Sequence, residues 1–182
     1  MTVAMPTRFR CGGCGHEVPW DEPAFACPAA RPDDDVDHIL VRIAEPGALR
    51  FPTPAEMGAE QNPFLRYRTL LHPYHVARAG GLADGDYVSL VERLDRRVAD
   101  VERRPRGFTI TPLLELDLDR DGAGVLAKDE TGNVSGSHKA RHLFGALLHV
   151  EILEAIGRGD GLRDRPMAIA SCGNAALAAA VV

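Results

Sequence analysis

Lys139 is the residue of this chain whose type and setting most clearly suggest covalent chemistry. It follows a loop rich in glycine and serine, residues 131–138, and opens a stretch in which apolar residues recur at helical spacing. Residues 124–128, before that loop, predict a short strand. A lysine at such a strand-to-helix junction in an α/β core can hold an aldehyde cofactor as a Schiff base. The alternative for this loop alone is a capped helix start that carries a surface lysine.

A second loop that contains glycine, residues 171–174 (Ser-Cys-Gly-Asn), precedes another predicted helix. Backbone amides at the start of a helix can bind an anion, and the side chain of Asn174 can donate to an oxyanion or a phenolate. Cys172 is interpreted as a small thiol rather than a nucleophile, because no His–Asp pair is evident near it. Taken alone, such a loop more often caps a helix than binds a ligand.

Three cysteines near the N-terminus have the spacing of a zinc ribbon. Cys11 and Cys14 form a Cys-x-x-Cys pair, and Cys27 follows after 12 residues. A tetrahedral structural zinc site requires four ligands, and an alanine stands where a fourth cysteine would be expected. We expect His38 to be the fourth ligand, because imidazole suits zinc and Asp37 or its neighbours can orient the ring. The alternative is a degenerate ribbon that binds no metal.

Composition and charge narrow the class of protein. The 182 residues are 45% hydrophobic and carry a formal net charge of −5, which suits a soluble domain and argues against nucleic acid as the main partner. No apolar run reaches the roughly 18 residues of a membrane span, so no membrane partner is expected. The N-terminus lacks the pattern of a signal peptide. The four cysteines are therefore expected to bind metal or to remain free thiols in the cytoplasm.

Residue composition and the pattern of predicted elements divide the chain into three parts. Residues 1–45 are rich in Cys, Gly, Pro and Asp and predict a small module held together by metal, and residues 46–107 predict a linker followed by helices. Residues 108–182 predict alternating strands and helices, which indicates the start of a parallel α/β domain. The chain stops inside an apolar helix, and we expect it to be the N-terminal part of a longer protein.

The spacing of apolar residues predicts the individual elements. Helices and strands are expected at the following positions: helices at 63–71, 85–103, 138–156 and from 174 onward, and strands at 109–114, 124–128 and 166–170. Both candidate loops then follow the carboxyl ends of strands, where ligands bind in parallel α/β sheets.

Together the two loops resemble those of the fold-type II enzymes that depend on pyridoxal phosphate, and threonine synthases most closely. Those enzymes carry Lys-Asp-Glu at a strand end, as in residues 128–130, and then Asn-x-Ser/Thr-Gly-Ser-aromatic-Lys-x-Arg, as in residues 133–141. Residues 171–174 resemble their Ser-Ser/Thr-Gly-Asn loop, and residues 111–113 resemble their Thr-Pro-Leu. The Arg-Tyr and Leu-Leu pairs within 66–71 resemble a segment of threonine synthases that carry an N-terminal Cys-x-x-Cys module.

The resemblance implies a parallel-sheet fold-type II core, of which this chain is the N-terminal portion, preceded by a small zinc-ribbon-like module. Lys139 would hold pyridoxal phosphate as a Schiff base and later move the α-proton. Asn174 would hydrogen-bond the 3-hydroxyl group of the cofactor. The carboxylate of the substrate would face Ser171, Cys172 and Gly173.

The function implied is that of a lyase or synthase that acts on an amino acid or its O-phospho derivative by β- or γ-elimination or replacement. The family also suggests a homodimer. The sequence departs from the family at His138, where an aromatic residue is usual, and at Cys172, where a hydroxyl residue is usual. The glycine-rich loop that binds the phosphate comes later in family members and is absent from these residues. Two alternatives stay open: another fold-type II activity, such as cysteine synthase or serine/threonine dehydratase, or a binding fragment without catalysis.

Overall fold

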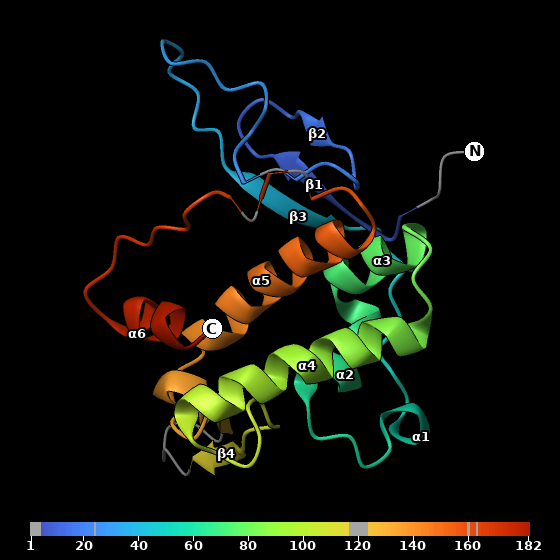
Figure 1. Cartoon of the computed structure of the whole chain (residues 1–182), viewed down its shortest axis with the longest axis vertical. Coiled ribbons are helices and arrows are strands. Elements are labelled where there is room, and N and C mark those ends of the chain that lie inside the picture. Colours follow the sequence, from blue (N-terminus) through green and yellow to red (C-terminus); the bar gives the residue numbers. More distant parts are fainter. Residues whose placement is uncertain (1–4, 24, 117–123, 160, 163) are drawn as a thin grey trace.

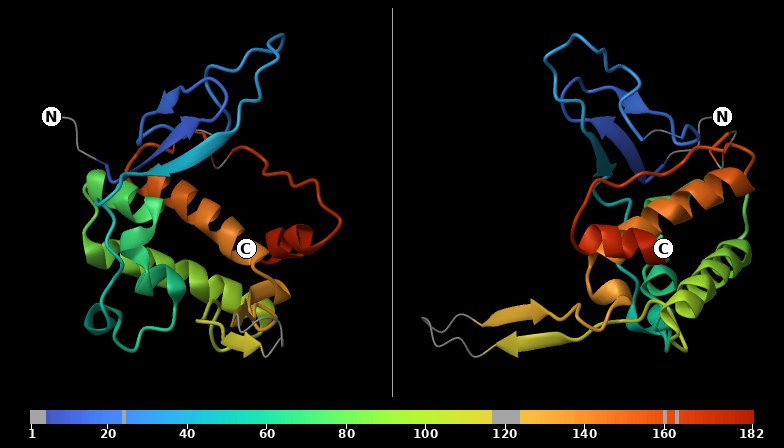
Figure 2. Two further views of the ribbon diagram at one scale, coloured as in Figure 1. Left: turned by 180° about the vertical axis from the view of Figure 1, so that it is seen from behind. Right: turned by 60° about the vertical axis from the view of Figure 1, so that its left-hand side comes forward.

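The computed structural model describes most of the chain, namely residues 5–23, 25–116, 124–159, 161–162 and 164–182. Small parts of the predicted ranges 1–45 and 108–182 lie outside the described residues. The described chain is mixed α/β, with a small N-terminal sheet, a body of helices and a hairpin that projects from the body (Figures 1 and 2).

The N-terminal sheet is antiparallel, and its strands lie in the order β2-β1-β3: β1 (Thr7–Cys11), β2 (Glu17–Val18) and β3 (Leu40–Ala44). Side chains alternate along a strand, so Thr7, Phe9 and Cys11 share one face of β1, and both ends of that face are buried. Phe9 pairs with Arg42 of β3. Because directly opposed residues lie on the same face of a sheet, Arg42 joins this surface.

Helices make up the body, and their bounds are α1 (Pro54–Met57), α2 (Pro63–Arg66), α3 (His72–Ala79), α4 (Asp84–Glu102), α5 (Lys139–Ala155) and α6 (Asn174–Val181), with 3-10 turns η1 (Arg68–Leu70) and η2 (Val134–Gly136). The helices expected at 85–103, at 138–156 and from 174 onward correspond to α4, α5 and α6. The helix expected at 63–71 is divided at Tyr67 into α2 and η1.

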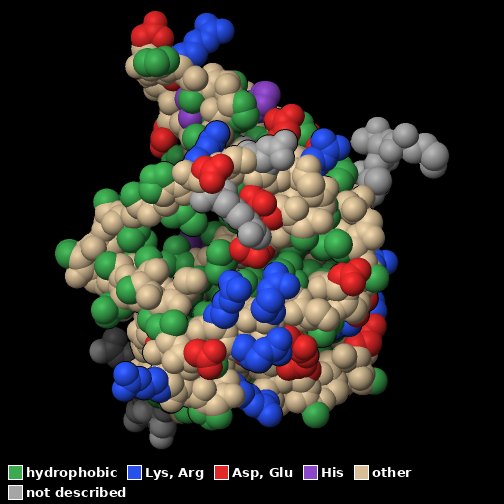
Figure 3. Space-filling view, viewed as in Figure 1, with side chains coloured by type: hydrophobic (Ala, Val, Ile, Leu, Met, Phe, Trp, Pro, Cys, Tyr) green, Lys and Arg blue, Asp and Glu red, His purple; other side chains and the backbone are tan. Residues whose placement is uncertain are grey.

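The core lies where α2, α4 and α5 meet. Phe64, Phe108 and Phe144 form an aromatic cluster in which the ring centroids are 4.5 to 5.1 Å apart. The apolar stripe of α4 is buried along most of its length, as its spacing predicts, and only Val101 in the last turn is exposed. The opposite face of α4 carries exposed charged side chains, namely Glu92, Arg93, Arg96, Arg97 and Asp100. Figure 3 shows Lys or Arg and Asp or Glu side chains gathered over the lower part of this view, where α4 runs in Figure 1.

The projecting hairpin corrects the predicted direction of the sheet. β4 (Leu113–Leu116) pairs antiparallel with β5 (Val125–Lys128) (Figure 2). A parallel pair needs a crossover connection of about a dozen residues or more, whereas a short link between consecutive strands returns the chain antiparallel. The expected parallel sheet was therefore wrong for this pair, and all sheets among the described residues are antiparallel.

The segment 166–170 forms no strand, which corrects a second expectation. Its side chains are exposed, with Met167 at 72%. A strand requires a neighbour for its backbone N–H and C=O groups, and no strand pairs with this segment within the part of the chain that the structure describes. The apolar composition alone therefore predicted a burial that does not occur. Among the described residues no helix has the length and apolar character to cross a membrane.

Candidate metal centre

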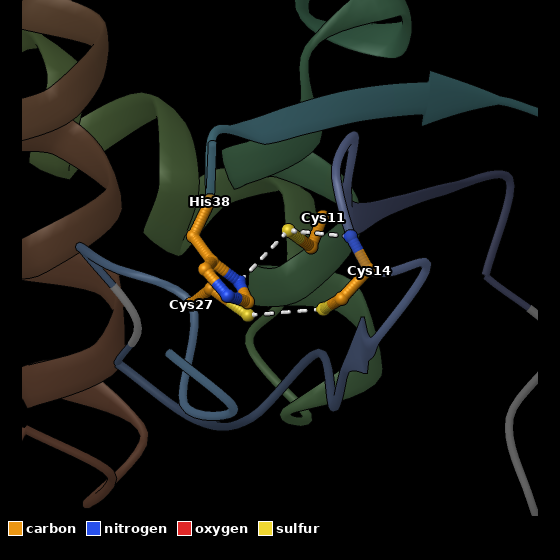
Figure 4. A group of neighbouring side chains, drawn as sticks. All are labelled: Cys11, Cys14, Cys27 and His38. Atoms are coloured by element: carbon orange, nitrogen blue, oxygen red, sulfur yellow. Dashed lines mark hydrogen bonds between the residues drawn. The ribbon is translucent and has the colours of Figure 1, made fainter. Parts of the chain in front are cut away.

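Two connections of the N-terminal module, from β1 to β2 and from β2 to β3, bring four candidate metal-binding side chains together. Cys11 is the last residue of β1, and Cys14 lies in the turn that follows it. Cys27 and His38 both come from the connection between β2 and β3, and His38 lies two residues before β3 begins. Their ligand atoms all lie within 4.8 Å of one another (Figure 4). These four side chains can hold a metal ion.

Two distances within this cluster match the separations expected in tetrahedral coordination. Metal–sulfur bonds of about 2.3 Å and metal–nitrogen bonds of about 2.0–2.1 Å give ligand separations of about 3.8 Å for two sulfurs and about 3.6 Å for sulfur and nitrogen. The Sγ atoms of Cys14 and Cys27 are 3.7 Å apart. The Sγ of Cys11 is 3.5 Å from Nδ1 of His38. These two separations are those expected for ligands around a central ion.

The electrostatics of the two buried thiols differ. The backbone N–H of Cys14 donates to the Cys11 sulfur at 3.5 Å and is the main reason that the pKa of Cys11 is lowered to about 6. Burial raises the pKa of Cys27 above its usual value. Of these two thiols, Cys11 is therefore the one that more readily forms a thiolate at neutral pH. A cation at the centre would favour the thiolate form of its neighbours as well.

His38 is oriented by Asp34, a residue that the sequence did not single out. Nε2 of His38 lies 3.0 Å from Oδ2 of Asp34. This hydrogen bond raises the pKa of His38 and lowers the pKa of Asp34, so the ring donates from Nε2 to a carboxylate. Nδ1 then points at the cluster with its lone pair. Such a carboxylate–histidine pair behind a ligand is typical of metal sites. The signal available in the sequence was the spacing of four residues between Asp34 and His38.

Gly13 is the other residue that the sequence analysis missed. A Cβ atom at this position would meet the backbone oxygen of Asp37 at 2.4 Å and Cγ1 of Val36 at 2.7 Å. Only glycine lets the segment before His38 pass so close to the turn between the first two cysteines. Gly13, the second glycine of the Cys-Gly-Gly-Cys motif, is thus needed for His38 to reach the cluster, and not only for the turn.

Lys139 lies away from this cluster, at the first position of α5, and is exposed. Its backbone N–H donates to Oγ of Ser137 at 3.4 Å. Its ammonium group makes no hydrogen bond or ion pair with any residue that the structure describes. The loop before it is held tightly, because Nδ2 of Asn133 donates to the carbonyl of Ser137 at 2.8 Å and the N–H of Ser135 donates to Glu102 at 2.8 Å.

The other residues of the predicted motif build the support of this loop. Arg141 donates from Nε to Glu130 at 2.8 Å and from Nη2 to the carbonyl of Thr109 at 3.0 Å. Thr111 donates from Oγ1 to the same glutamate at 2.5 Å. The ammonium of Lys128 donates to the carbonyl of Thr111. Residues from three separate segments of the motif are therefore joined in one polar network beside the start of α5.

The loop also carries polar atoms without partners. Oδ1 of Asn133 and Oγ of Ser135 are buried and make no hydrogen bond within the described chain. Ser135 has a φ of 53°, in the left-handed region that non-glycine residues rarely adopt. Strained backbone and unsatisfied polar groups of this kind concentrate at sites that bind or react.

The second predicted loop lies at the start of α6. Ser171, Cys172, Gly173 and Asn174 are all exposed, and the N–H of Gly173 donates to Oγ of Ser171 at 3.3 Å. α6 packs against both η2 and α5, so the helix that follows the second loop is a neighbour of the Lys139 loop (Figure 1).

The structure thus separates the predicted residues into two groups. One is the metal cluster in the N-terminal module, and the other is the pair of loops at α5 and α6. Comparisons of the chain with protein-family models, with curated proteins and with solved structures found no match.

Proposed function

We propose that the chain binds one structural zinc ion through Cys11, Cys14, Cys27 and His38, and that the ion holds the N-terminal module in its fold. The observation that carries this proposal is the convergence of the four ligand atoms within 4.8 Å, with 3.7 Å between two sulfurs and 3.5 Å between sulfur and nitrogen. Thiolate and imidazole ligands suit zinc, and oxygen-seeking cations such as magnesium and calcium do not prefer them. Four protein ligands leave no position for a substrate, which is typical of a structural rather than a catalytic ion.

The test is metal analysis of protein purified without chelator, combined with zinc titration of the metal-free chain. We expect one zinc per chain and loss of tight binding in Cys27→Ser. Cys172→Ser is the matched control, because Cys172 is the one cysteine outside the cluster and is exposed. Absence of zinc, or equal affinity in the two variants, would contradict the proposal.

We further propose that Lys139 is the attachment point of pyridoxal phosphate in a lyase or synthase that acts on an amino acid or its O-phospho derivative. Support comes from the uncommitted ammonium of Lys139, from the strained loop before it, and from the unpartnered polar atoms of Asn133 and Ser135. These groups fit a polar cofactor, which would supply hydrogen-bond partners that the chain leaves missing. When bound, the cofactor supplies an electron sink for a carbanion at the α-carbon of the substrate.

In this proposal each group of the chain has a separate task. The amine of Lys139 holds the cofactor aldehyde and accepts and returns a proton. Glu130 and Arg141 keep the loop in place, and the amide of Asn174 donates to the ring hydroxyl. The exposed turn at 171–173 offers a hydroxyl, a thiol and backbone N–H groups to the carboxylate of the substrate. The same residues fit other members of the fold-type II group, so the choice of substrate is left to the assay.

Reductive trapping tests this proposal directly, because the chain has only two lysines, Lys128 and Lys139. Borohydride reduction in the presence of pyridoxal phosphate, followed by peptide mapping, should place the adduct on Lys139. Lys139→Arg should abolish it and Lys128→Arg should not.

A reactive surface amine would also be labelled, and a second variant separates that case. Asn174→Leu should reduce labelling of Lys139 if Asn174 contacts the cofactor, whereas an ordinary surface lysine would be labelled equally in both proteins. An adduct on Lys128, or equal labelling of Lys139 in Asn174→Leu and in the unmodified chain, would contradict the proposal.

A further inference from the structure

A cavity of about 400 Å³ lies between the N-terminal sheet and the helices. Phe9 and Arg42 line it from the sheet, His72 lines it from α3, and Gly145 and His149 line it from α5. Its volume falls within the range of about 300–1,000 Å³ that is usual for small-molecule sites. The remaining wall is mostly apolar or aromatic, and no acidic side chain lines the cavity among the described residues.

Two of the three histidines that line this apolar cavity, His72 and His149, give it buried polar atoms that lack partners. His72 is 3% exposed; its Nδ1 is 2.8 Å from Oγ1 of Thr7, while its Nε2 is buried without a hydrogen bond. Nδ1 of His149 is likewise buried and unpartnered. The two rings are 5.3 Å apart, and the ring of Phe9 lies 4.7 Å from that of His72. Leaving buried polar atoms unpaired is costly, so a molecule that pairs with them is stabilised on binding.

The charges of the side chains that line the cavity indicate which small molecules it can bind. Arg42 donates from Nη1 to the carbonyl of Leu70 at 3.3 Å and makes no ion pair with any described residue, so the other guanidinium donors are free for a ligand. Arg141, which also lines the cavity, is already paired with Glu130. Burial lowers the pKa of His72 to about 3, so this imidazole is neutral near pH 7 and can donate one hydrogen bond. A carboxylate suits these groups, whereas an ammonium group would face Arg42 and meet no acidic side chain in the described lining.

We propose that this cavity binds a small aromatic monocarboxylate, with its ring against the aromatic wall at Phe9 and its carboxylate on the guanidinium of Arg42. The planar fork of arginine matches a carboxylate in two hydrogen bonds. The neutral imidazoles of His72 and His149 complete the polar contacts. Phe25, which is 59% exposed and lines the cavity, offers an aromatic surface to cover the bound ring. The side chains proposed to contact the acid, Phe9, Arg42, His72 and His149, include neither Lys139 nor a residue of the metal cluster.

The probes are phenylacetate, phenylacetamide and phenethylamine, each titrated into the full chain by calorimetry. Phenylacetate should bind at one saturable site, and the other two should bind at least roughly ten-fold more weakly, because they lack the charge that Arg42 recognises. Equal binding of phenethylamine, or no saturable binding of phenylacetate to the folded protein, would overturn the proposal.

Two glycines offer a matched pair of variants. Gly145 lines the cavity, and Gly85 lies on the exposed face of α4, and a Cβ atom at either position would meet no neighbour. Both substitutions raise helix propensity, so both proteins should fold. Gly145→Leu should fill the cavity and abolish binding, and Gly85→Leu should leave it unchanged. Arg42→Gln should weaken phenylacetate roughly ten-fold and leave phenylacetamide unchanged. Full binding by Gly145→Leu would place the ligand elsewhere and refute the site.

Discussion

Nε2 of His38 lies 3.0 Å from Oδ2 of Asp34, and the two residues polarise each other. Because Nε2 carries the proton, Nδ1 is the nitrogen that faces Cys11 at 3.5 Å. The orientation of the one imidazole in the candidate metal cluster therefore depends on a carboxylate that lies outside the cluster.

Replacing that carboxylate should weaken metal binding without removing a ligand. We expect Asp34→Asn to reduce zinc affinity by roughly ten-fold, because the ring loses its charged acceptor and is oriented less strictly. Competition with a chromophoric chelator measures the change. Asp33→Asn is the control, since Asp33 is exposed and makes no contact with His38. Equal affinities in the two variants would show that Asp34 does not orient the ligand.

Gly13→Ala should destabilise the metal module by about 1–3 kcal/mol, because the added methyl group meets the backbone oxygen of Asp37 and must displace it. Gly12→Ala provides the comparison, since its Cβ would lie 3.5 Å or more from its nearest neighbours. Denaturant unfolding of zinc-loaded protein gives both values. A Gly12→Ala protein that is as unstable as Gly13→Ala would point to the turn itself rather than to the passage of residues 36–37.

The Glu130–Arg141 pair should be worth more than an exposed ion pair. Both side chains are mostly buried, at 17% and 23% exposure, and Arg141 also donates to two other groups. Arg141→Met should therefore lower the free energy of unfolding by about 2 kcal/mol and increase proteolysis of the loop before Lys139. In Arg50→Met, which breaks the exposed pair with Glu56, we expect little change. Equal losses of unfolding free energy in the two variants would show that the network at Arg141 stabilises the fold no more than an exposed ion pair does.

Sequence reasoning succeeded where the signal was local. The apolar stripe of α4 has a helical period that can be counted in the sequence, and the spacing of Cys11, Cys14 and Cys27 reflects a strand end and two turns. It failed where the outcome depends on a distant partner. Residues 166–170 have the composition of a buried strand, but no strand in the described chain pairs with them. The cavity beside His72 was also invisible, because sheet and helix residues far apart in the sequence form it together.

Acid should destabilise the fold through the buried histidines. Burial lowers the pKa of His72 to about 3 and that of His149 to about 4, and the neighbouring charges of His149, Arg42 and His75 act on His72 in the same direction. As the pH falls below the unfolded value of 6.5, the unfolded chain takes up protons that the folded chain does not. Stability should then fall by up to about 1.4 kcal/mol per pH unit for each histidine.

The measurement is urea unfolding at several values between about pH 7 and about pH 5. His72→Gln keeps a polar group near Thr7 but cannot titrate, so its stability should depend less steeply on pH than that of the unmodified protein. Parallel curves for the two proteins would show that His72 is not the source of the acid sensitivity.

One strand connects the two binding sites. The buried face of β1 begins at Thr7, which bonds His72 at the cavity, and ends at Cys11, a residue of the candidate metal cluster. If either ligand orders β1 at its own end, the free-energy cost of ordering the other end falls. Zinc and an aromatic acid would then be mutual effectors, and thermodynamic reciprocity requires each to tighten the other by the same factor. A chelator in the buffer would then weaken binding of the aromatic acid to the cavity, and the acid would slow or reduce loss of the metal.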